Sequence, residues 1–131
     1  MSNATIGTGS RNSPQDSSQT TNELNVTTPT GLKYDSEKPR MDLLDSGFLE
    51  DVAKVLTFGA NKYAAHNWRG GINYSRLIGA AYRHLGAINR GEDIDPESGL
   101  PHSAHLGCCV MFLNWMMANK PNLDDRYKIS E

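Results

Sequence analysis

Three of the four histidines in this 131-residue sequence are spaced so that they can meet inside one small helical domain. His84 falls on the apolar side of a helical pattern that also contains Leu77 and Ile88. His102 and His105, three residues apart, begin the apolar side of a later helical pattern. A histidine on such a side is often a core residue satisfied by one hydrogen bond, but a pair at positions i and i+3 also binds transition metals. The three histidines are therefore candidates for binding a metal or for orienting its ligands.

Carboxylates are concentrated between these two helical patterns, at Glu92, Asp93, Asp95 and Glu97. Four negative charges in six positions repel one another unless a cation or solvent separates them. One interpretation is a solvated turn that caps the following helix. The other is a magnesium or manganese site, because hard divalent ions prefer several carboxylate oxygens in octahedral geometry. The spacing is not that of an EF-hand loop, since the glycine and the closing glutamate are misplaced.

A fifth carboxylate, Glu50, belongs to a polar stripe on an earlier helical pattern, together with Lys54, Thr57 and Asn61. The ordinary interpretation is a solvated helix face with an ion pair between Glu50 and Lys54, which adds only about 0.3 kcal/mol. The alternative interpretation is that the stripe faces a ligand.

Cations and aromatic residues flank this earlier helix on both sides. Three cations in eight residues precede it and form a candidate phosphate clamp: Lys33, Lys38 and Arg40. The group that follows it combines cations, rings and an amide in one loop: Lys62, Tyr63, Asn67, Trp68 and Arg69. Asparagine can read a purine edge, and aromatic rings can stack on a base. The ordinary interpretation of each segment is a solvated loop, anchored in the second case by the tryptophan.

Three amphipathic helices must position these residues. We expect the first over about residues 46–63, with Asp45 or Ser46 as its N-cap. The second is expected over about residues 75–90, with Gly91 just after its end as a stop signal.

The third helix is expected to begin near Pro101, with Ser98 as a candidate cap, and to end at Lys120–Pro121. The apolar sides of the three helices, which we expect to form the core, include Leu49, Leu85, Val110 and Met117. No segment between the helices alternates as a strand does, so the predicted fold class is all-α.

Composition divides the chain into a tail and one domain. In residues 1–31, 23 residues are Ser, Thr, Asn, Gln, Gly or Pro, too few apolar side chains remain to order the segment, and we predict a disordered tail. Residues 32–131 form one small domain whose marginal core favours a homo-oligomer, a dimer or a tetramer.

Charge and hydropathy argue against two classes of partner for this domain, nucleic acids and membranes. The net charge of −2 gives no basic excess for stable nucleic-acid binding, and no apolar run is long enough for a membrane span. The two adjacent cysteines and the lack of a signal sequence at the printed start favour the cytoplasm, which is the host cytoplasm if a phage encodes the chain.

Taken in order, these motifs resemble a known family. The segments that carry the resemblance span about residues 32–115 and are Lys33-Tyr34-Asp35, Lys38-Pro39-Arg40, Glu50, Val55 to Ala60, Lys62-Tyr63, Asn67-Trp68, Arg83-His84-Leu85, Gly91-Glu92, Asp95 to Leu100, His102 and His105. They resemble the phage dATP/dGTP diphosphohydrolases, small MazG-like members of the all-α nucleoside triphosphate pyrophosphohydrolases that include the MazZ proteins of 2-aminoadenine phages.

The resemblance implies a helical bundle that oligomerises, binds two or three Mg²⁺ or Mn²⁺ ions and releases pyrophosphate from a purine deoxynucleoside triphosphate. In the wider MazG group the metals are held by Glu-x-x-Glu on one helix and Glu-x-x-Asp on the next. This sequence departs from that pattern, because Lys54 follows Glu50 at i+4 and Ala53 at i+3. Glu92-x-x-Asp95 has the letters of the second motif, but Pro96 predicts that Asp95 lies outside a helix.

The resemblance leads us to assign roles residue by residue. The expected metal ligands are Glu50, Glu92, Asp95 and Glu97, with Glu50 and His84 as the catalytic residues. The expected phosphate-binding residues are Lys33, Lys38, Arg40, Lys54, Lys62 and Arg83. The expected nucleoside-binding residues are Tyr63, Asn67 and Trp68, and His102 orients a ligand or touches the substrate.

The predicted function is metal-dependent hydrolysis of dGTP, with dATP as a second substrate, to the monophosphate and pyrophosphate. The product dGMP would serve phage nucleotide metabolism in a 2-aminoadenine pathway. The alternative is a small helical phage module that binds a host protein or nucleic acid. A His/Asp metallophosphohydrolase is disfavoured, because the sequence contains no His-Asp dipeptide.

Overall fold

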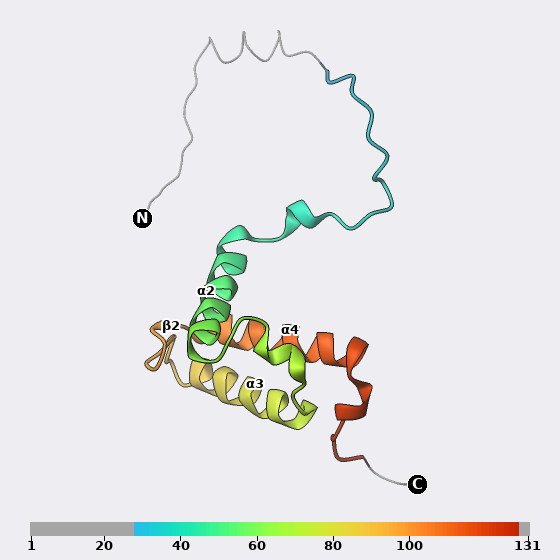
Figure 1. Ribbon diagram of the computed structural model, residues 1–131. Helices are drawn as coiled ribbons and strands as arrows, with labels where there is room; N and C mark the ends of the chain where they lie inside the picture. Colours follow the sequence, from blue (N-terminus) through green and yellow to red (C-terminus); the bar gives the residue numbers. More distant parts are fainter. Residues whose placement is uncertain (1–27, 129–131) are drawn as a thin grey trace, which may run out of the picture. The chain divides into compact units, whose positions relative to one another are not determined.

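The computed structural model describes residues 28–128 of the chain (Figure 1). Most of the predicted tail, residues 1–27, lies outside the described residues. Residues 28–39 and residues 40–128 belong to two separate compact units. The first segment is exposed and contains one turn, in which the Lys38 N–H donates to the Asp35 carbonyl at 3.0 Å. All helices and strands described below belong to the second unit.

Three α-helices dominate this unit, as the sequence predicted. The elements follow in the order 3₁₀ helix η1 (Met41–Leu43), α2 (Ser46–Lys62), 3₁₀ helix η2 (Asn67–Gly70), α3 (Tyr74–Asn89), β1 (Ile94–Asp95), β2 (Leu100–Pro101), α4 (His102–Asn119) and 3₁₀ helix η3 (Pro121–Leu123). None of these helices is both long and apolar enough to cross a membrane.

Local signals account for most helix ends. The Asp45 carboxylate accepts from the Phe48 N–H at 2.7 Å, which confirms Asp45 as the N-cap of α2. Gly91 adopts a φ of +92° directly after α3, where a side chain would be strained, so its role as a stop signal is confirmed. Lys120 and Pro121 follow the last residue of α4, as expected.

The cap predicted for α4 is wrong. Pro101 occupies the N-cap position and no side chain caps the helix there. Ser98 instead lies in the preceding turn, where its hydroxyl accepts from the Leu100 N–H at 3.2 Å and contacts His105. Because the Ser98 hydroxyl is used within the turn, it does not cap α4.

A small β-hairpin joins α3 to α4, where the sequence predicted only a loop. Ile94 pairs with Pro101 and Asp95 with Leu100 in antiparallel register. Strands of two residues are too short for any alternation to be visible in the sequence. The hairpin confirms that Asp95 lies outside a helix, and it brings the acidic segment back against the start of α4.

The core consists of two clusters that share α4. Val52 and Val55 of α2 pack against Ala104 and Cys108 in the first half of α4. Tyr74 and Leu77 of α3 pack against Met116 in its second half. Figure 1 shows α3 and α4 side by side and α2 against the start of α4. The central helix α4 thus connects both parts of the core.

Several side chains predicted for the core are exposed in this single chain, and that part of the prediction is wrong. The exposed fractions are 46% for Leu49, 51% for Leu85, 56% for Val110 and 47% for Met117. Val110 and Met117 are exposed because α4 carries no Asp, Glu, Lys or Arg and has apolar residues on all sides, while α2 and α3 cover only part of it. Leu49 of α2 and Leu85 of α3 are only partly covered by the rest of this unit.

Candidate functional site

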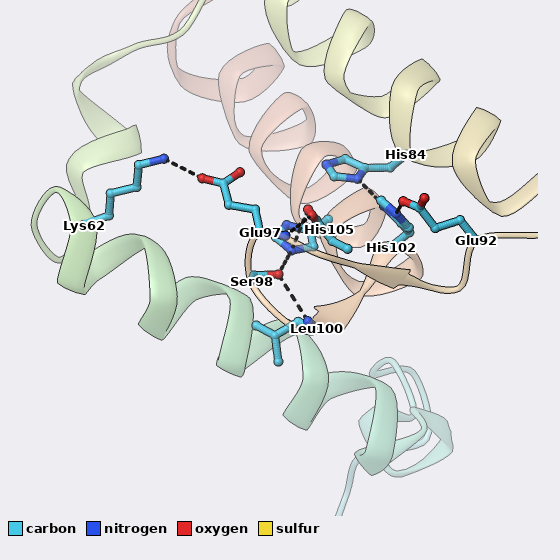
Figure 2. A network of polar contacts seen from close by, with 9 residues as sticks. Lys62, His84, Glu92, Glu97, Ser98, Leu100, His102 and His105 are labelled. Atoms are coloured by element: carbon cyan, nitrogen blue, oxygen red, sulfur yellow. Dashed lines mark hydrogen bonds and ion pairs between the residues drawn. The ribbon is translucent and has the colours of Figure 1, made fainter.

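Three histidines from two helices meet at the start of α4, next to the hairpin. His84 of α3 and His102 of α4 face each other with their Nδ1 atoms 2.9 Å apart, as Figure 2 shows. The rings of His84 and His105 are stacked, with centroids 4.8 Å apart and an angle of 11° between the planes. The predicted convergence of the three histidines is confirmed.

The hairpin adds carboxylates to this group. Oε2 of Glu92 lies 2.7 Å from Nε2 of His102, whose side chain is only 7% exposed. Because a carboxylate can only accept, the hydrogen of His102 lies on Nε2, which then donates to Glu92. In the neutral ring Nδ1 of His102 therefore carries a lone pair and accepts from the Nδ1–H of His84. A carboxylate behind a histidine in this way fixes the tautomer that a metal ligand needs.

His105 has a different set of partners. Its Nε2 lies 2.7 Å from the Ser98 hydroxyl and 3.5 Å from Oδ2 of Asp95. Both groups approach the same ring nitrogen, whereas a nucleophilic triad needs the serine and the carboxylate on opposite nitrogens. The arrangement therefore holds the ring in place and does not activate Ser98.

Burial favours the neutral form of two of the histidines by lowering their pKa. Burial lowers the pKa of His84, and the neighbouring His105 and His102 lower it further, although Asp95 acts in the opposite direction. Burial also lowers the pKa of His105 from its usual value. Neutral imidazoles have a lone pair available, which is the form that binds metals.

The closest group of candidate metal ligands is His84, Asp95 and His102. One ligand atom of each lies within 4.8 Å of the others. Two neighbouring ligands at about 2.1 Å from a metal lie about 3.0 Å apart in octahedral geometry, which is close to the Nδ1–Nδ1 distance of 2.9 Å. If the hydrogen of His84 lies on Nε2 instead of Nδ1, the Nδ1 atoms of both neutral rings have a free lone pair for the same ion. Two imidazoles and a carboxylate fit a transition ion such as Mn²⁺ better than Mg²⁺.

A pocket of about 600 Å³ adjoins this cluster. His105 and Glu97 form part of its wall, whereas His84, Asp95 and His102 do not line it. His105 connects the pocket to this cluster, because it stacks on His84 and lies 3.5 Å from Asp95. The opposite parts of the wall come from the second half of α2 and from the segment between α2 and α3. Its volume falls in the range typical of small-molecule sites.

An ion pair lies where the pocket meets the hairpin. Nζ of Lys62 contacts Oε2 of Glu97 at 3.1 Å, and Figure 2 shows this lysine reaching from α2 toward the hairpin. Both side chains are about half exposed, so the pair contributes little to stability. Such an exposed pair can exchange partners at little cost.

The residues expected to bind the nucleoside all line the pocket. Tyr63 is 66% exposed and Asn67 is exposed, so both are accessible to a ligand. Trp68 is more enclosed, because it stacks on Phe112 at 4.5 Å and meets Trp115 edge-on at 5.2 Å. Its ring is therefore an anchor of the wall as well as a surface of the pocket.

Several residues expected to bind metal or phosphate lie outside the pocket wall. Glu50 and Lys54 are exposed on α2, and within residues 28–128 no ion pair joins them. Arg83 is exposed on α3. The Arg40 guanidinium makes two hydrogen bonds to the Asp42 carboxylate, at 2.8 and 2.7 Å. Lys33 and Lys38 belong to the other unit, and their relation to the site is not defined.

The structure brings four further residues into this region: His66, Arg69, Ser98 and His105. The sequence did not single out His66, and it indicated Arg69 only as part of the loop after the first helix, Ser98 only as a helix cap and His105 only as a candidate metal-binding partner of His102. The i, i+3 spacing of His102 and His105 was the available signal for His105. The other three depend on turn conformations that leave no periodic pattern.

These features define a class of protein: a small all-α domain with histidines and carboxylates clustered at one end of a ligand pocket. A sequence model of the family described as dATP/dGTP diphosphohydrolase, N-terminal, matches residues 28–126. A Salmonella phage PMBT28 protein named dATP/dGTP diphosphohydrolase is 41% identical over 97 residues, which are 74% of this chain and 33% of that protein.

The chain belongs to the dATP/dGTP diphosphohydrolase family. It spans about a third of the length of the phage relative, within which its counterpart is only one part. No solved structure shows significant similarity to it.

Proposed function

We propose that this domain hydrolyses a purine deoxynucleoside triphosphate to the monophosphate and pyrophosphate, with dGTP preferred and dATP as a second substrate. One observation supports the proposal most directly: a candidate ion site lies next to a pocket that is large enough for a nucleotide. The ion site consists of His84, Asp95 and His102. The name of the phage relative supports the same substrates.

The proposed reaction depends on a divalent ion, Mn²⁺ or Mg²⁺. Such an ion would neutralise charge on the triphosphate and lower the pKa of the attacking water. His84, Asp95 and His102 would hold it, and Glu92 would keep His102 in the required tautomer. Glu97 and Glu50 are the further carboxylates available if two or three ions bind.

The pocket provides separate surfaces for the two ends of the substrate. Lys62 would leave Glu97 and bind a phosphate oxygen, since it lies where the pocket meets the hairpin. Tyr63 and Asn67 line the part of the pocket that comes from the α2–α3 segment, which suits the base and sugar. Water would then attack the α-phosphorus beside the histidines, with pyrophosphate as the leaving group.

We also propose that the domain functions as a homo-oligomer and, in a phage that uses 2-aminoadenine, supplies dGMP to that pathway. Support for self-association comes from exposed apolar side chains on α3 and α4, among them Tyr82, Leu85, Val110 and Met117. Exposure of such a surface to water is unfavourable, so a second copy that covers it would stabilise the protein.

The test is to incubate the protein with each deoxynucleoside triphosphate and Mn²⁺ and to identify the phosphorus products by NMR. The proposal predicts pyrophosphate and dGMP from dGTP, a slower reaction with dATP, and loss of both in Asp95→Asn. The asparagine keeps an oxygen that can accept the Glu97 N–H, so the turn is preserved. Release of orthophosphate, or an unchanged rate in Asp95→Asn, would contradict the proposal.

A further inference from the structure

The guanidinium of Arg69 lies on the pocket wall and contacts three neighbouring side chains. Its Nε–H donates to Nδ1 of His66 at 3.0 Å. Its Cζ atom lies over the Trp68 ring, 4.3 Å from the ring centre, and 5.4 Å from the centre of the Trp115 ring. A long side chain fixed at three places loses little further entropy when it binds a ligand.

His66, which orients this arginine, has an uncommon backbone conformation. Its φ is +62°, and among residues 28–128 it is the one residue other than glycine with a positive φ. Such a conformation is unfavourable for most side chains and is often retained at functional sites. Here it places the histidine on the pocket wall beside Arg69, so that Nδ1 can accept from the arginine.

The outer nitrogens of Arg69 remain available. Within residues 28–128 no carboxylate or carbonyl accepts from them, in contrast to Arg40 and Arg126, which bind aspartates with two bonds each. An arginine that lines a pocket, is preorganised by its neighbours and keeps two parallel donors unused is suited to a ligand with two adjacent acceptors.

We propose that Arg69 determines base specificity by donating to O6 and N7 of guanine; this inference rests on the proposed function. Guanine presents these two acceptors side by side, whereas adenine presents N7 next to an amino group that donates. The adjoining wall contains Ile72 and Phe112, which suit a planar base, and the charged groups Lys62 and Glu97 belong to the phosphate end. Arg69 therefore favours dGTP over dATP and uses no contact with the phosphates.

The test measures binding, so that it does not depend on turnover. The probes are the α,β-methylene analogues of dGTP, dATP and dITP, which cannot release pyrophosphate, and their dissociation constants are measured by calorimetry with Mn²⁺. The wild-type protein should bind the dGTP analogue about tenfold or more tightly than the dATP analogue. The dITP analogue keeps O6 and N7 but lacks the 2-amino group, so it should bind like the dGTP analogue.

The variants separate base reading from phosphate binding. Arg69→Gln should reverse or abolish the preference, because glutamine matches the adenine edge. The control Arg76→Gln, on the exposed side of α3 and absent from the pocket wall, should retain the wild-type preference. His66→Ala, which keeps Arg69 but removes its support, should reduce the preference without reversing it.

An equal loss of affinity for both analogues in Arg69→Gln would identify Arg69 as a phosphate ligand and overturn the inference. Unchanged selectivity in that variant, or no preference in the wild type, would overturn it as well. If no triphosphate is hydrolysed but selective binding is present and depends on Arg69, the proposed function fails while the inference about base reading stands.

Discussion

His102 contacts both groups that define the candidate site, His84 on one side and Glu92 on the other. Helical spacing was enough to predict that the histidines converge, because residues at i and i+3 share a helix face. Which carboxylate contacts which histidine was not predictable, since this depends on how the hairpin folds back onto α4. For the same reason, sequence reasoning ranked Glu50 beside Glu92 and Asp95, although only the last two contact the histidine cluster.

The two aromatic residues of the pocket should differ in what they stabilise. Trp68 packs against Phe112 and Trp115, so Trp68→Ala should lower the free energy of unfolding by about 2–4 kcal/mol. Tyr63 is 66% exposed, so Tyr63→Ala should lower it by less than about 0.5 kcal/mol. Urea unfolding of both variants provides the comparison, and similar values for the two would show that Trp68 is not an anchor.

Histidine burial predicts how stability depends on pH in the metal-free protein. The pKa values of His84 and His105 lie below their usual 6.5 in the folded state. Below that pH the unfolded chain takes up protons that the folded protein does not, so stability falls as pH decreases. The melting temperature should therefore be lower at about pH 5.5 than at about pH 7.5.

Carboxylates contribute little in this window, because those with resolved shifts, such as Asp124 and Asp125, have lowered pKa values and titrate at more acidic pH. The double variant His84→Asn, His105→Asn is the control and should show a weaker pH dependence. A wild-type melting temperature that rises on acidification would contradict the assignment of neutral histidines.

The conformation of the segment between α2 and α3 depends on one glycine, Gly71. Gly71 has a φ of +117°, and a Cβ there would lie 2.8 Å from Cδ1 of Leu123 in η3. Gly71→Ala should therefore lower the free energy of unfolding by about 1–3 kcal/mol. The neighbouring Gly70 has an ordinary φ and open space around it, so Gly70→Ala should change the free energy by less than about 0.5 kcal/mol. Equal effects in chemical denaturation would mean that η3 does not pack on this segment.

Helix existence and most helix ends were predictable because the signals are local: an apolar period, an aspartate cap and a glycine stop. The cap of α3 could not be predicted in this way. Asn73 makes no side-chain cap. Instead Asp125, fifty residues after Ser75, accepts from the Ser75 N–H at 2.8 Å and from the Ser75 hydroxyl at 2.6 Å. A cap supplied from a distant segment leaves no trace near the helix that it stabilises.

For the whole molecule, the exposed apolar surface of α3 and α4 predicts self-association. Val110→Lys places a charge on this surface at a position that is 56% exposed in the single chain, so the fold should be retained while the oligomer dissociates. Light scattering after size exclusion measures the mass. Asn122→Lys, at an exposed polar position in η3, is the control and should leave the mass unchanged. A wild-type protein that is monomeric at high concentration would refute the proposal.

The same surface explains why the predicted core was partly wrong. An apolar period identifies the side of a helix that avoids water, but it does not distinguish a neighbour within the chain from one in another copy. Val52, Val55 and Met116 are buried within the chain, whereas Leu85 and Val110 are not. Composition and spacing were therefore sufficient for the fold class and insufficient for the packing.

His84, Asp95 and His102 are proposed to form a divalent-ion site next to the pocket. The most direct measurement is titration of the protein with Mn²⁺, with free ion followed by electron paramagnetic resonance, for the wild type, Asp95→Asn and Asp93→Asn. Asp93 is the matched control, because it is an exposed carboxylate of the same segment and is outside the candidate ligand group. Asp95→Asn should weaken Mn²⁺ binding by about tenfold or more, while Asp93→Asn should bind like the wild type. Equal affinity in the wild type and Asp95→Asn would contradict the claim.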